Sequence, residues 1–101
     1  MTYDLALTAL ADPRRRSVFE ALRAGPKAVG VIARDLGISQ PAVSQHLAVL
    51  RGARLVRSRA QGTRRLYEPD AAGLAAVRSY FDAFWGDVLE AYAQSFTESD
   101  Q

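Results

Sequence analysis

Residues 37–56 read GISQPAVSQHLAVLRGARLV and predict a helix with an unusual outward face. Val43, Leu47 and Leu50 recur at helical spacing and are expected to face a core. The outward positions between them carry almost no charge, although a solvated surface helix normally shows Glu and Lys there. These outward residues are Pro41, Ser44, Gln45 and Ala48.

The residues before this helix complete a helix-turn-helix pattern. We expect a preceding helix over residues 26–37 that ends at Gly37, and Ser39 is expected to cap the next helix, with Pro41 in its first turn. The inward face of the preceding helix is predicted to be Val29, Ile32, Ala33 and Leu36. Two helices joined by a short turn that contains Gly are typical of DNA-binding helix-turn-helix units. An ordinary helical hairpin is the alternative, and the neutral outward face favours DNA recognition.

The flanking segments predict the rest of one domain over residues 1–101, since a chain of this length builds a single core. Asp12 and Pro13 begin a helix that Gly25 stops, with Val18, Leu22 and the stem of Arg15 on its inner face. The fold class is therefore mainly helical with a small β-hairpin. The expected parts are a first helix over 3–11, the helix-turn-helix over about 28–52, a hairpin over about 55–68 that turns at 61–63, and a last helix over about 70–96 capped by Asp70.

Composition excludes several classes of protein. The 101 residues include no Cys, which excludes a disulfide framework, a thiolate metal site and a Cys nucleophile. No run of eighteen apolar residues occurs and the first residues lack the basic region of a signal peptide, so we expect a cytoplasmic protein without a membrane segment. Ser44 and His46 point to different helix faces, so no catalytic pair, no enzyme activity and no cofactor are expected.

Charge is distributed unevenly along the chain. Residues 1–78 hold all thirteen Lys and Arg with six Asp and Glu, whereas residues 79–101 hold five acids and no base. A basic body of this kind indicates a polyanionic partner, here double-stranded DNA.

Residue types divide the expected DNA contacts into base reading and phosphate binding. Gln and Ser side chains bond to base edges, and small apolar groups contact thymine methyls. The base-reading residues are predicted to be Gln40, Pro41, Ser44, Gln45 and Ala48. Phosphate contacts are predicted for Arg51, Arg54, Arg57, Arg59, Arg64 and Arg65. The alternative for the hairpin arginines is a solubilising role, and for Arg14, Arg15 and Arg16 pairing with acids is weighed equally against phosphate contact.

The last helix predicts a partner, because its apolar residues cover about half of its circumference, from Leu74 to Phe96. A core needs only a stripe about 100° wide. A homodimer is therefore expected, with an intramolecular core helix as the alternative. The dimer contacts are predicted to be Tyr3, Leu5, Leu7, Phe81, Phe84, Trp85, Val88, Leu89 and Tyr92.

The stretches ALADPRRRSVFEALRAG and VGVIARDLGISQPAVSQHLAVLRGARLVRSRAQGTRRLYEPD resemble the ArsR/SmtB family of winged-helix transcriptional repressors, over roughly residues 8–70. The resemblance implies a dimer with four helices, a β-wing and a fifth helix, and repression that a signal relieves. It also implies that Gln40, Ser44 and Gln45 read DNA. The residues that match basic wing positions of the family are Arg59, Arg64 and Arg65.

The chain departs from the metal-sensing members of that family. Ala28 and Gly30 stand where many members have metal-binding cysteines, the last helix has no His, and Val31 replaces an acid. The lone His46 is expected to be structural rather than a metal ligand. We therefore predict a repressor that binds a pseudo-palindromic operator without metal. The alternatives are a repressor that responds to a small organic inducer, in a dimer cleft lined by Tyr3, Phe81, Phe84 and Trp85, or a winged helix used as a protein-interaction module.

Overall fold

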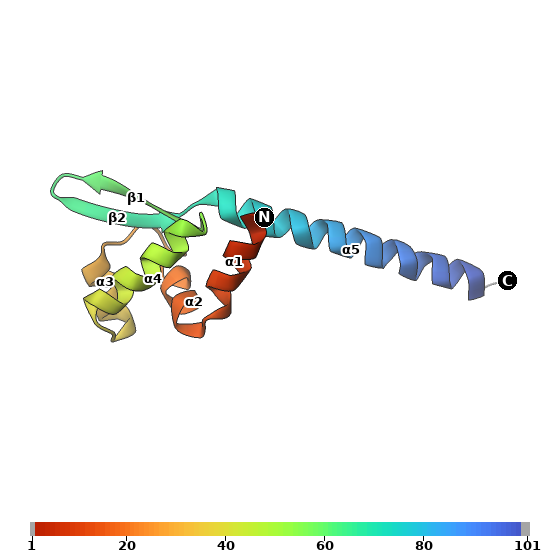
Figure 1. Ribbon diagram of the computed structural model, residues 1–101, viewed down its shortest axis with the longest axis horizontal. Coiled ribbons are helices and arrows are strands. Elements are labelled where there is room, and N and C mark those ends of the chain that lie inside the picture. Colours follow the sequence, from red (N-terminus) through yellow and green to blue (C-terminus); the bar gives the residue numbers. More distant parts are fainter. Residues whose placement is uncertain (1, 100–101) are drawn as a thin grey trace.

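The computed structural model describes residues 2–99 as a helical body with a hairpin at one side and one long projecting helix (Figure 1). The elements are α1 (Thr2–Ala11), α2 (Pro13–Glu20), α3 (Val29–Leu36), α4 (Gln40–Gly52), β1 (Val56–Gln61), β2 (Arg64–Pro69) and α5 (Ala71–Ser99). The predicted fold class, mainly helical with a small antiparallel hairpin, is confirmed.

The corner between α1 and α2 is built by side chains of the sequence ADPRRR. Asp12 caps α2, and its Oδ1 accepts hydrogen bonds from the backbone N–H groups of Arg14 (2.9 Å) and Arg15 (3.2 Å). Arg15 Nη1 donates to the Ala9 carbonyl (3.3 Å) and Arg16 Nη1 to the Leu10 carbonyl (2.8 Å), which satisfies carbonyls that the end of α1 leaves open.

Helix α5 ends at Ser99 and not at about residue 96, and one boundary each of α2 and α3 differs more clearly from the sequence prediction. Helix α2 ends at Glu20 and not next to Gly25, because the residues after Glu20 form tighter turns such as Arg23 N–H to Glu20 carbonyl (3.0 Å). Helix α3 begins at Val29 and not at residue 26. Lys27 instead forms a β-bridge with Tyr67, in which each backbone N–H donates to the other residue's carbonyl at 3.0 and 2.9 Å. The backbone of Lys27 is therefore used by the hairpin and cannot join the helix.

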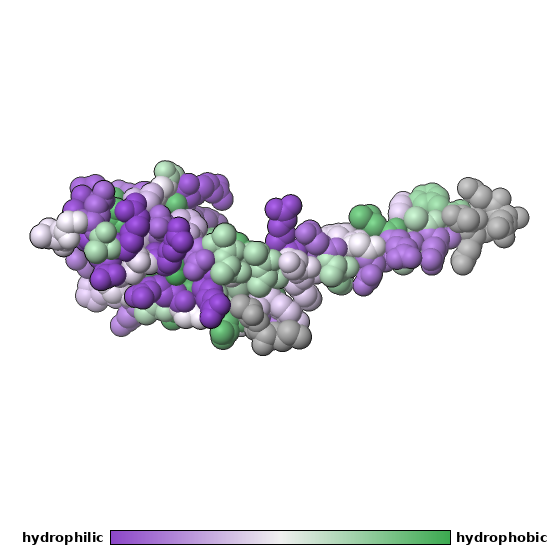
Figure 2. All heavy atoms as spheres, turned by 90° about the horizontal axis from the view of Figure 1, so that it is seen from above, coloured by the Kyte–Doolittle hydropathy of each residue, from purple (hydrophilic) through white to green (hydrophobic). Residues whose placement is uncertain are grey.

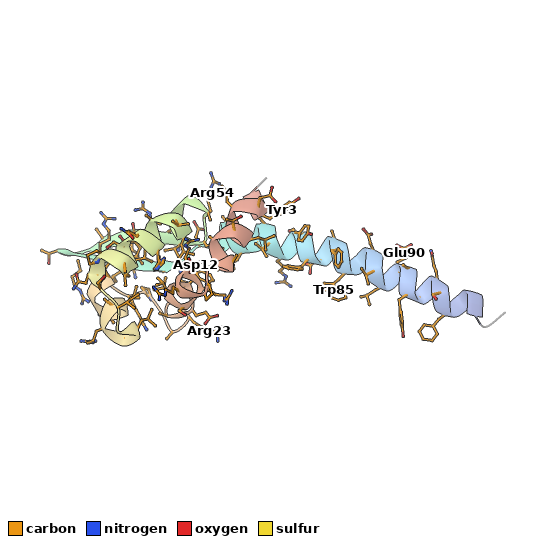
Figure 3. The ribbon with its side chains drawn as sticks, turned by 60° about the horizontal axis from the view of Figure 1, so that its bottom comes forward. Tyr3, Asp12, Arg23, Arg54, Trp85 and Glu90 are labelled. Atoms are coloured by element: carbon orange, nitrogen blue, oxygen red, sulfur yellow. The ribbon has the colours of Figure 1, made fainter. Side chains whose placement is uncertain are left out.

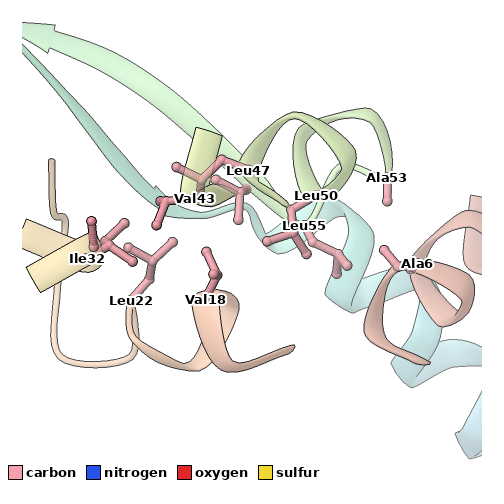
Figure 4. Packing of buried hydrophobic residues seen from close by; sticks show 12 residues of the cluster. Ala6, Val18, Leu22, Ile32, Val43, Leu47, Leu50, Ala53 and Leu55 are labelled. Carbon is pink, nitrogen blue, oxygen red and sulfur yellow. The ribbon is translucent and has the colours of Figure 1, made fainter. Parts of the chain in front are cut away.

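The core lies between α2, α3 and α4, where their buried side chains meet (Figure 4). The largest fully buried side chains are Val18, Leu22, Ile32, Val43, Leu47, Leu50 and Leu55. The predicted inward residues of α4 and the predicted burial of Val18 and Leu22 are thus confirmed, although Leu22 lies after the end of α2 and Arg15 is only half-buried. Gly37 ends α3 with φ 68°, a left-handed conformation that glycine adopts at little cost, and Ser39 Oγ caps α4 by accepting from Ala42 N–H (3.2 Å).

Strands β1 and β2 pair antiparallel, from Val56 opposite Pro69 to Gln61 opposite Arg64. Gly62 begins the two-residue turn with φ 64°, which the tight hairpin turns require at this position. We call residues 56–69 the wing. Val56 and Leu66 are buried and fix the base of the wing on the body.

Helix α5 begins against the end of α4 and then leaves the body. Asp70 Oδ1 caps it by accepting from Ala72 N–H (2.9 Å), and Val77 packs on the core. Every described side chain from residue 78 to 96 is exposed, and the molecule measures 68 × 24 × 23 Å. Among the described residues, no helix is long and apolar enough to cross a bilayer.

Candidate nucleic-acid interface

Five predicted base-reading residues form one exposed surface on α4. We call this surface the reading face; it consists of Gln40, Pro41, Ser44, Gln45 and Ala48, all exposed. Their spacing of one, four, five and eight residues places them along one side of the helix. The opposite side holds Val43, Leu47 and Leu50, whose burial fixes the direction in which the reading face points.

Two details of this surface were not predicted from the sequence. Val49 is 44 % exposed, so α4 presents a further apolar group beside Ala48. Gln40 lies over Gly30 of α3, where a Cβ would sit 3.4 Å from Gln40 Nε2. The glycine leaves room for this amide at the first residue of α4. The helical wheel of α4 alone could have shown Val49 at the border of the outward face, whereas the approach of Gln40 to Gly30 depends on how two helices pack.

The predicted wing arginines are all exposed, and two of them share one acid. Arg57 Nε lies 3.2 Å and Arg59 Nε 3.4 Å from the same oxygen, Glu68 Oε1. Arg65 Nη1 donates to Ser58 Oγ at 3.0 Å. Arg64 makes no ion pair with any residue that the structure describes. These arginines are predicted from the sequence, but Glu68 is not, because its role depends on the strand register that sets it opposite Arg57.

Arg51 and Arg54 lie at the end of α4, between the reading face and the wing. Both are exposed, and Arg54 adopts φ 60°, which turns the chain from the helix into β1 (Figure 3). The polar side chains of the body gather beside the wing, whereas apolar groups recur along α5 (Figure 2). The arginines on α4 and the wing thus border the neutral reading face.

The arginines of α2 have different surroundings. Arg15 and Arg16 bind the carbonyls at the end of α1, and Arg15 Nη2 lies 3.6 Å from Asp12 Oδ2. Arg15 therefore pairs with an acid, as its structural alternative expects, whereas Arg16 binds a backbone carbonyl and makes no ion pair with a described residue. Arg14 is exposed beside a surface cavity that Ser17, Leu36 and Ile38 also line.

The positions at which the family resemblance implies metal ligands carry no donor side chain. Ala28 and Gly30 offer no donor side chain, and no group of three or more His, Cys, Asp or Glu among residues 2–99 could hold a metal ion. His46 is half-buried on α4, and Val31 is half-buried on α3.

The protomer has three surface cavities that do not coincide with the aromatic cleft predicted to bind an inducer. The first cavity is lined by residues that include Phe19 and Arg23. The second includes Arg14 and Ile38, and the third includes Ala75 and Arg78.

A second surface, distant from the reading face, carries the predicted dimer contacts. Six of them lie on α5 and are exposed, with Trp85 at 54 % and Leu89 at 60 %. On α1, Leu5 is 60 % exposed, while Tyr3 and Leu7 are half-buried. Tyr3 stacks on Tyr80 with ring centroids 4.8 Å apart, which joins the two helices. We call this the apolar surface; it consists of Tyr3, Leu5, Leu7, Phe81, Phe84, Trp85, Val88, Leu89 and Tyr92.

Comparison with known proteins assigns this architecture. The model of the family described as "Bacterial regulatory protein, arsR family" matches residues 12–58. The HTH-type transcriptional regulator Rv2034 of Mycobacterium tuberculosis is 57 % identical over 91 residues, which cover 90 % of this chain and 85 % of that protein. The transcriptional repressor SdpR of Bacillus subtilis is 35 % identical over 54 residues, 54 % of this chain and 60 % of SdpR. The homodimeric winged helix-turn-helix DNA-binding domain of Mb0332 from Mycobacterium bovis has a TM-score of 0.66 and 27 % identity, covering 90 % of this chain and 82 % of that one. These relatives are transcription regulators and DNA-binding domains, not enzymes.

Proposed function

Since this chain belongs to the ArsR family of bacterial regulatory proteins and is a DNA-binding transcriptional regulator, we propose that it is a homodimeric repressor of a pseudo-palindromic operator. The observation that carries the proposal is the exposed, uncharged reading face of α4 bordered by arginines. A helix with this surface fits the major groove of B-DNA.

The reading face supplies specificity in this proposal. Gln45 and Gln40 carry amides that can bond bidentately to adenine, and the Ser44 hydroxyl can donate or accept. Pro41, Ala48 and Val49 present apolar groups suited to thymine methyls. Since these groups carry no charge, they add little affinity for a DNA of the wrong sequence.

The arginines supply affinity that does not depend on sequence. Arg51 and Arg54 would contact phosphates beside the major groove, and the wing arginines would contact phosphates beside α4. Binding through these residues releases counterions, so it weakens as the salt concentration rises.

The apolar surface supplies the two-fold symmetry. The homodimeric state of the Mb0332 domain supports pairing of this chain with a second copy. Exposed apolar side chains along α5, with Leu5 on α1, offer a contiguous surface for that pairing. A two-fold dimer presents two copies of α4, and such dimers bind half-sites about one helical turn of DNA apart. Repression would then follow from occupation of a promoter, and the relative SdpR, a transcriptional repressor, supports this direction of control. Because Ala28 and Gly30 carry no donor groups, we propose a repressor that works without a metal at these positions.

Selection of bound duplexes from a random DNA pool tests the proposal. We expect an inverted repeat to emerge, and the Gln45→Ala variant to lose about 1–3 kcal/mol of preference for it, about 5- to 150-fold. Affinity for a scrambled duplex should change little. Gln94→Ala, the same substitution at an exposed residue of α5, is the matched control. Selection of no preferred sequence, or a protein that ignores DNA at low salt, would contradict the proposal.

A further inference from the structure

Glu68 is the one acid in the wing, among four arginines. Its carboxylate is mostly covered, with a side chain 18 % exposed, while Arg57 and Arg59 are 66 % and 48 % exposed. A single oxygen, Oε1, lies 3.2 Å from Arg57 Nε and 3.4 Å from Arg59 Nε. One negative charge thus sits between two of the positive charges that the proposed function assigns to phosphate binding.

The ion pairs contribute little to the stability of the fold. Both arginine partners are largely exposed, so solvent screens their attraction to Glu68, and their long side chains lose freedom on pairing. The base of the wing is already fixed by buried Val56 and Leu66 and by the bridge from Lys27 to Tyr67. Stability therefore does not account for an acid at this position.

We propose that Glu68 limits the affinity of the wing for the DNA backbone. The inference rests on the proposed function, because it assumes that the wing lies near phosphates. The carboxylate acts in two ways: it cancels one of the two charges on Arg57 and Arg59, and it repels approaching phosphates within the screening distance of about 8–10 Å. Both effects are independent of sequence, so they weaken binding to operator and non-operator DNA alike.

Glu68 also has an effect that favours DNA binding, but this effect on affinity is smaller than the loss caused by its charge. Glu68 holds the two arginines together, which reduces the freedom that they lose on binding. This ordering is limited because the two arginines are largely exposed and pair weakly. The charge acts on every phosphate near the wing and also changes the number of counterions released. We therefore expect removal of the charge to tighten binding.

The test measures the affinity of full-length Glu68→Gln protein for the selected operator and for a scrambled duplex between 50 and 200 mM salt. We expect tighter binding to both duplexes by a similar factor. If one more phosphate is neutralised, the advantage over the unmodified protein should shrink about 3.5-fold across this salt range. Glu68→Lys should continue the trend, with tighter binding than Glu68→Gln. Glu90→Gln removes the same charge from α5, away from the wing, and should leave the salt dependence unchanged.

Further variants separate the inference from the proposed function. The double variant Arg57→Ala, Arg59→Ala should weaken binding to both duplexes, and in that background Glu68→Gln should have a smaller effect. If the double variant has the same affinity for both duplexes as the unmodified protein, the wing contact in the proposed function is wrong, and the inference about Glu68 is then also wrong. If the double variant weakens binding but Glu68→Gln and Glu68→Lys bind like the unmodified protein or more weakly, the inference alone is overturned. Thermal melting of each variant, followed by circular dichroism, identifies any loss that comes from unfolding.

Discussion

At the scale of the residue, Asp12 connects the first two helices through its carboxylate. It caps α2 and lies beside Arg15, which in turn binds the Ala9 carbonyl of α1. The hydrogen bond from Arg15 N–H lowers the pKa of this carboxyl below its ordinary value of 3.8, although desolvation acts in the opposite direction. The hydrogen bond from Arg14 N–H and the electrostatic interactions with Arg15 and His46 lower the pKa further. The ionised form is therefore the form that the folded corner prefers.

This preference predicts how stability changes in acid. Because the pKa of Asp12 is lower in the folded than in the unfolded chain, its contribution is fully present above about pH 3.8 and is lost as the pH falls through the lower folded value. Asp12→Asn keeps a capping side chain but removes the charge. We expect this variant to be less stable than the unmodified protein at pH 7, and the difference to vanish in acid. Urea unfolding at several pH values measures this.

The control for the acid experiment is Glu20→Gln, at the other end of the same helix. Glu20 makes no ion pair with a described residue, so its variant should not reproduce the pH-dependent loss. An Asp12→Asn difference that persists unchanged at low pH would show that shape, and not charge, explains the role of Asp12.

At the scale of the element, the joint between α4 and α5 is formed by backbone atoms. Gly73 N–H donates to the Arg54 carbonyl (2.8 Å) and Asp70 N–H to the Leu55 carbonyl (2.8 Å). A Cβ on Gly73 would overlap the Arg54 carbonyl oxygen and would lie 2.8 Å from that of Ala53. Backbone atoms cannot rotate away as a side chain can. The first turn of α5 therefore rests directly on the end of the helix that carries the reading face.

Two glycines of α5 provide a matched pair of variants for this joint. Gly73→Ala should force the helices apart and destabilise the fold by about 1–3 kcal/mol, as overpacking does. Gly86→Ala meets nothing within 4 Å and should stabilise α5 by up to about 1 kcal/mol, because alanine is the better helix former. Urea unfolding compares the two variants. Equal stability of Gly73→Ala and the unmodified protein would mean that the joint tolerates a wider separation.

Elements whose signals are local could be predicted from the sequence. The caps at Asp12 and Ser39 and the buried spacing of α4 depend on residues a few positions apart, and these predictions are confirmed. The late start of α3 could not be predicted, because Lys27 pairs with Tyr67, forty residues further along the chain. The contact of Glu68 with two arginines could not be predicted for the same reason, because it depends on the register of the two strands. The DNA contacts of the reading face stay a prediction, since exposure alone does not test them.

At the scale of the whole molecule, α5 carries the apolar surface beyond the body that could cover it. Its side chains from residue 78 to 96 are exposed, including large aromatic groups, and the long axis of the molecule reaches 68 Å. Monomeric proteins rarely expose large contiguous apolar patches. This arrangement supports the proposed pairing of two copies and excludes the alternative that α5 is only a core helix of one protomer.

The single tryptophan offers a direct measure of that pairing. Trp85 is 54 % exposed in the protomer, so its fluorescence should shift to shorter wavelength when a second copy covers it and return on dilution. Leu89→Glu should keep the protein monomeric in sedimentation and the emission at long wavelength, since a charge in an apolar interface is costly.

Gln94→Glu places the same charge on the polar side of α5 and serves as the control. It should pair as the unmodified protein does. An emission maximum that is independent of concentration, together with a monomer mass at all concentrations, would refute pairing through α5.

Because the apolar surface on α5 lies apart from the reading face, the concentration of the protein would determine the concentration of dimers that can bind an operator. Association of two copies depends on concentration by mass action. When cell growth dilutes the protein, the occupancy of its operators would therefore fall more steeply than the total concentration of the protein. A gene under its control would then respond to dosage with a threshold, before any inducer is present.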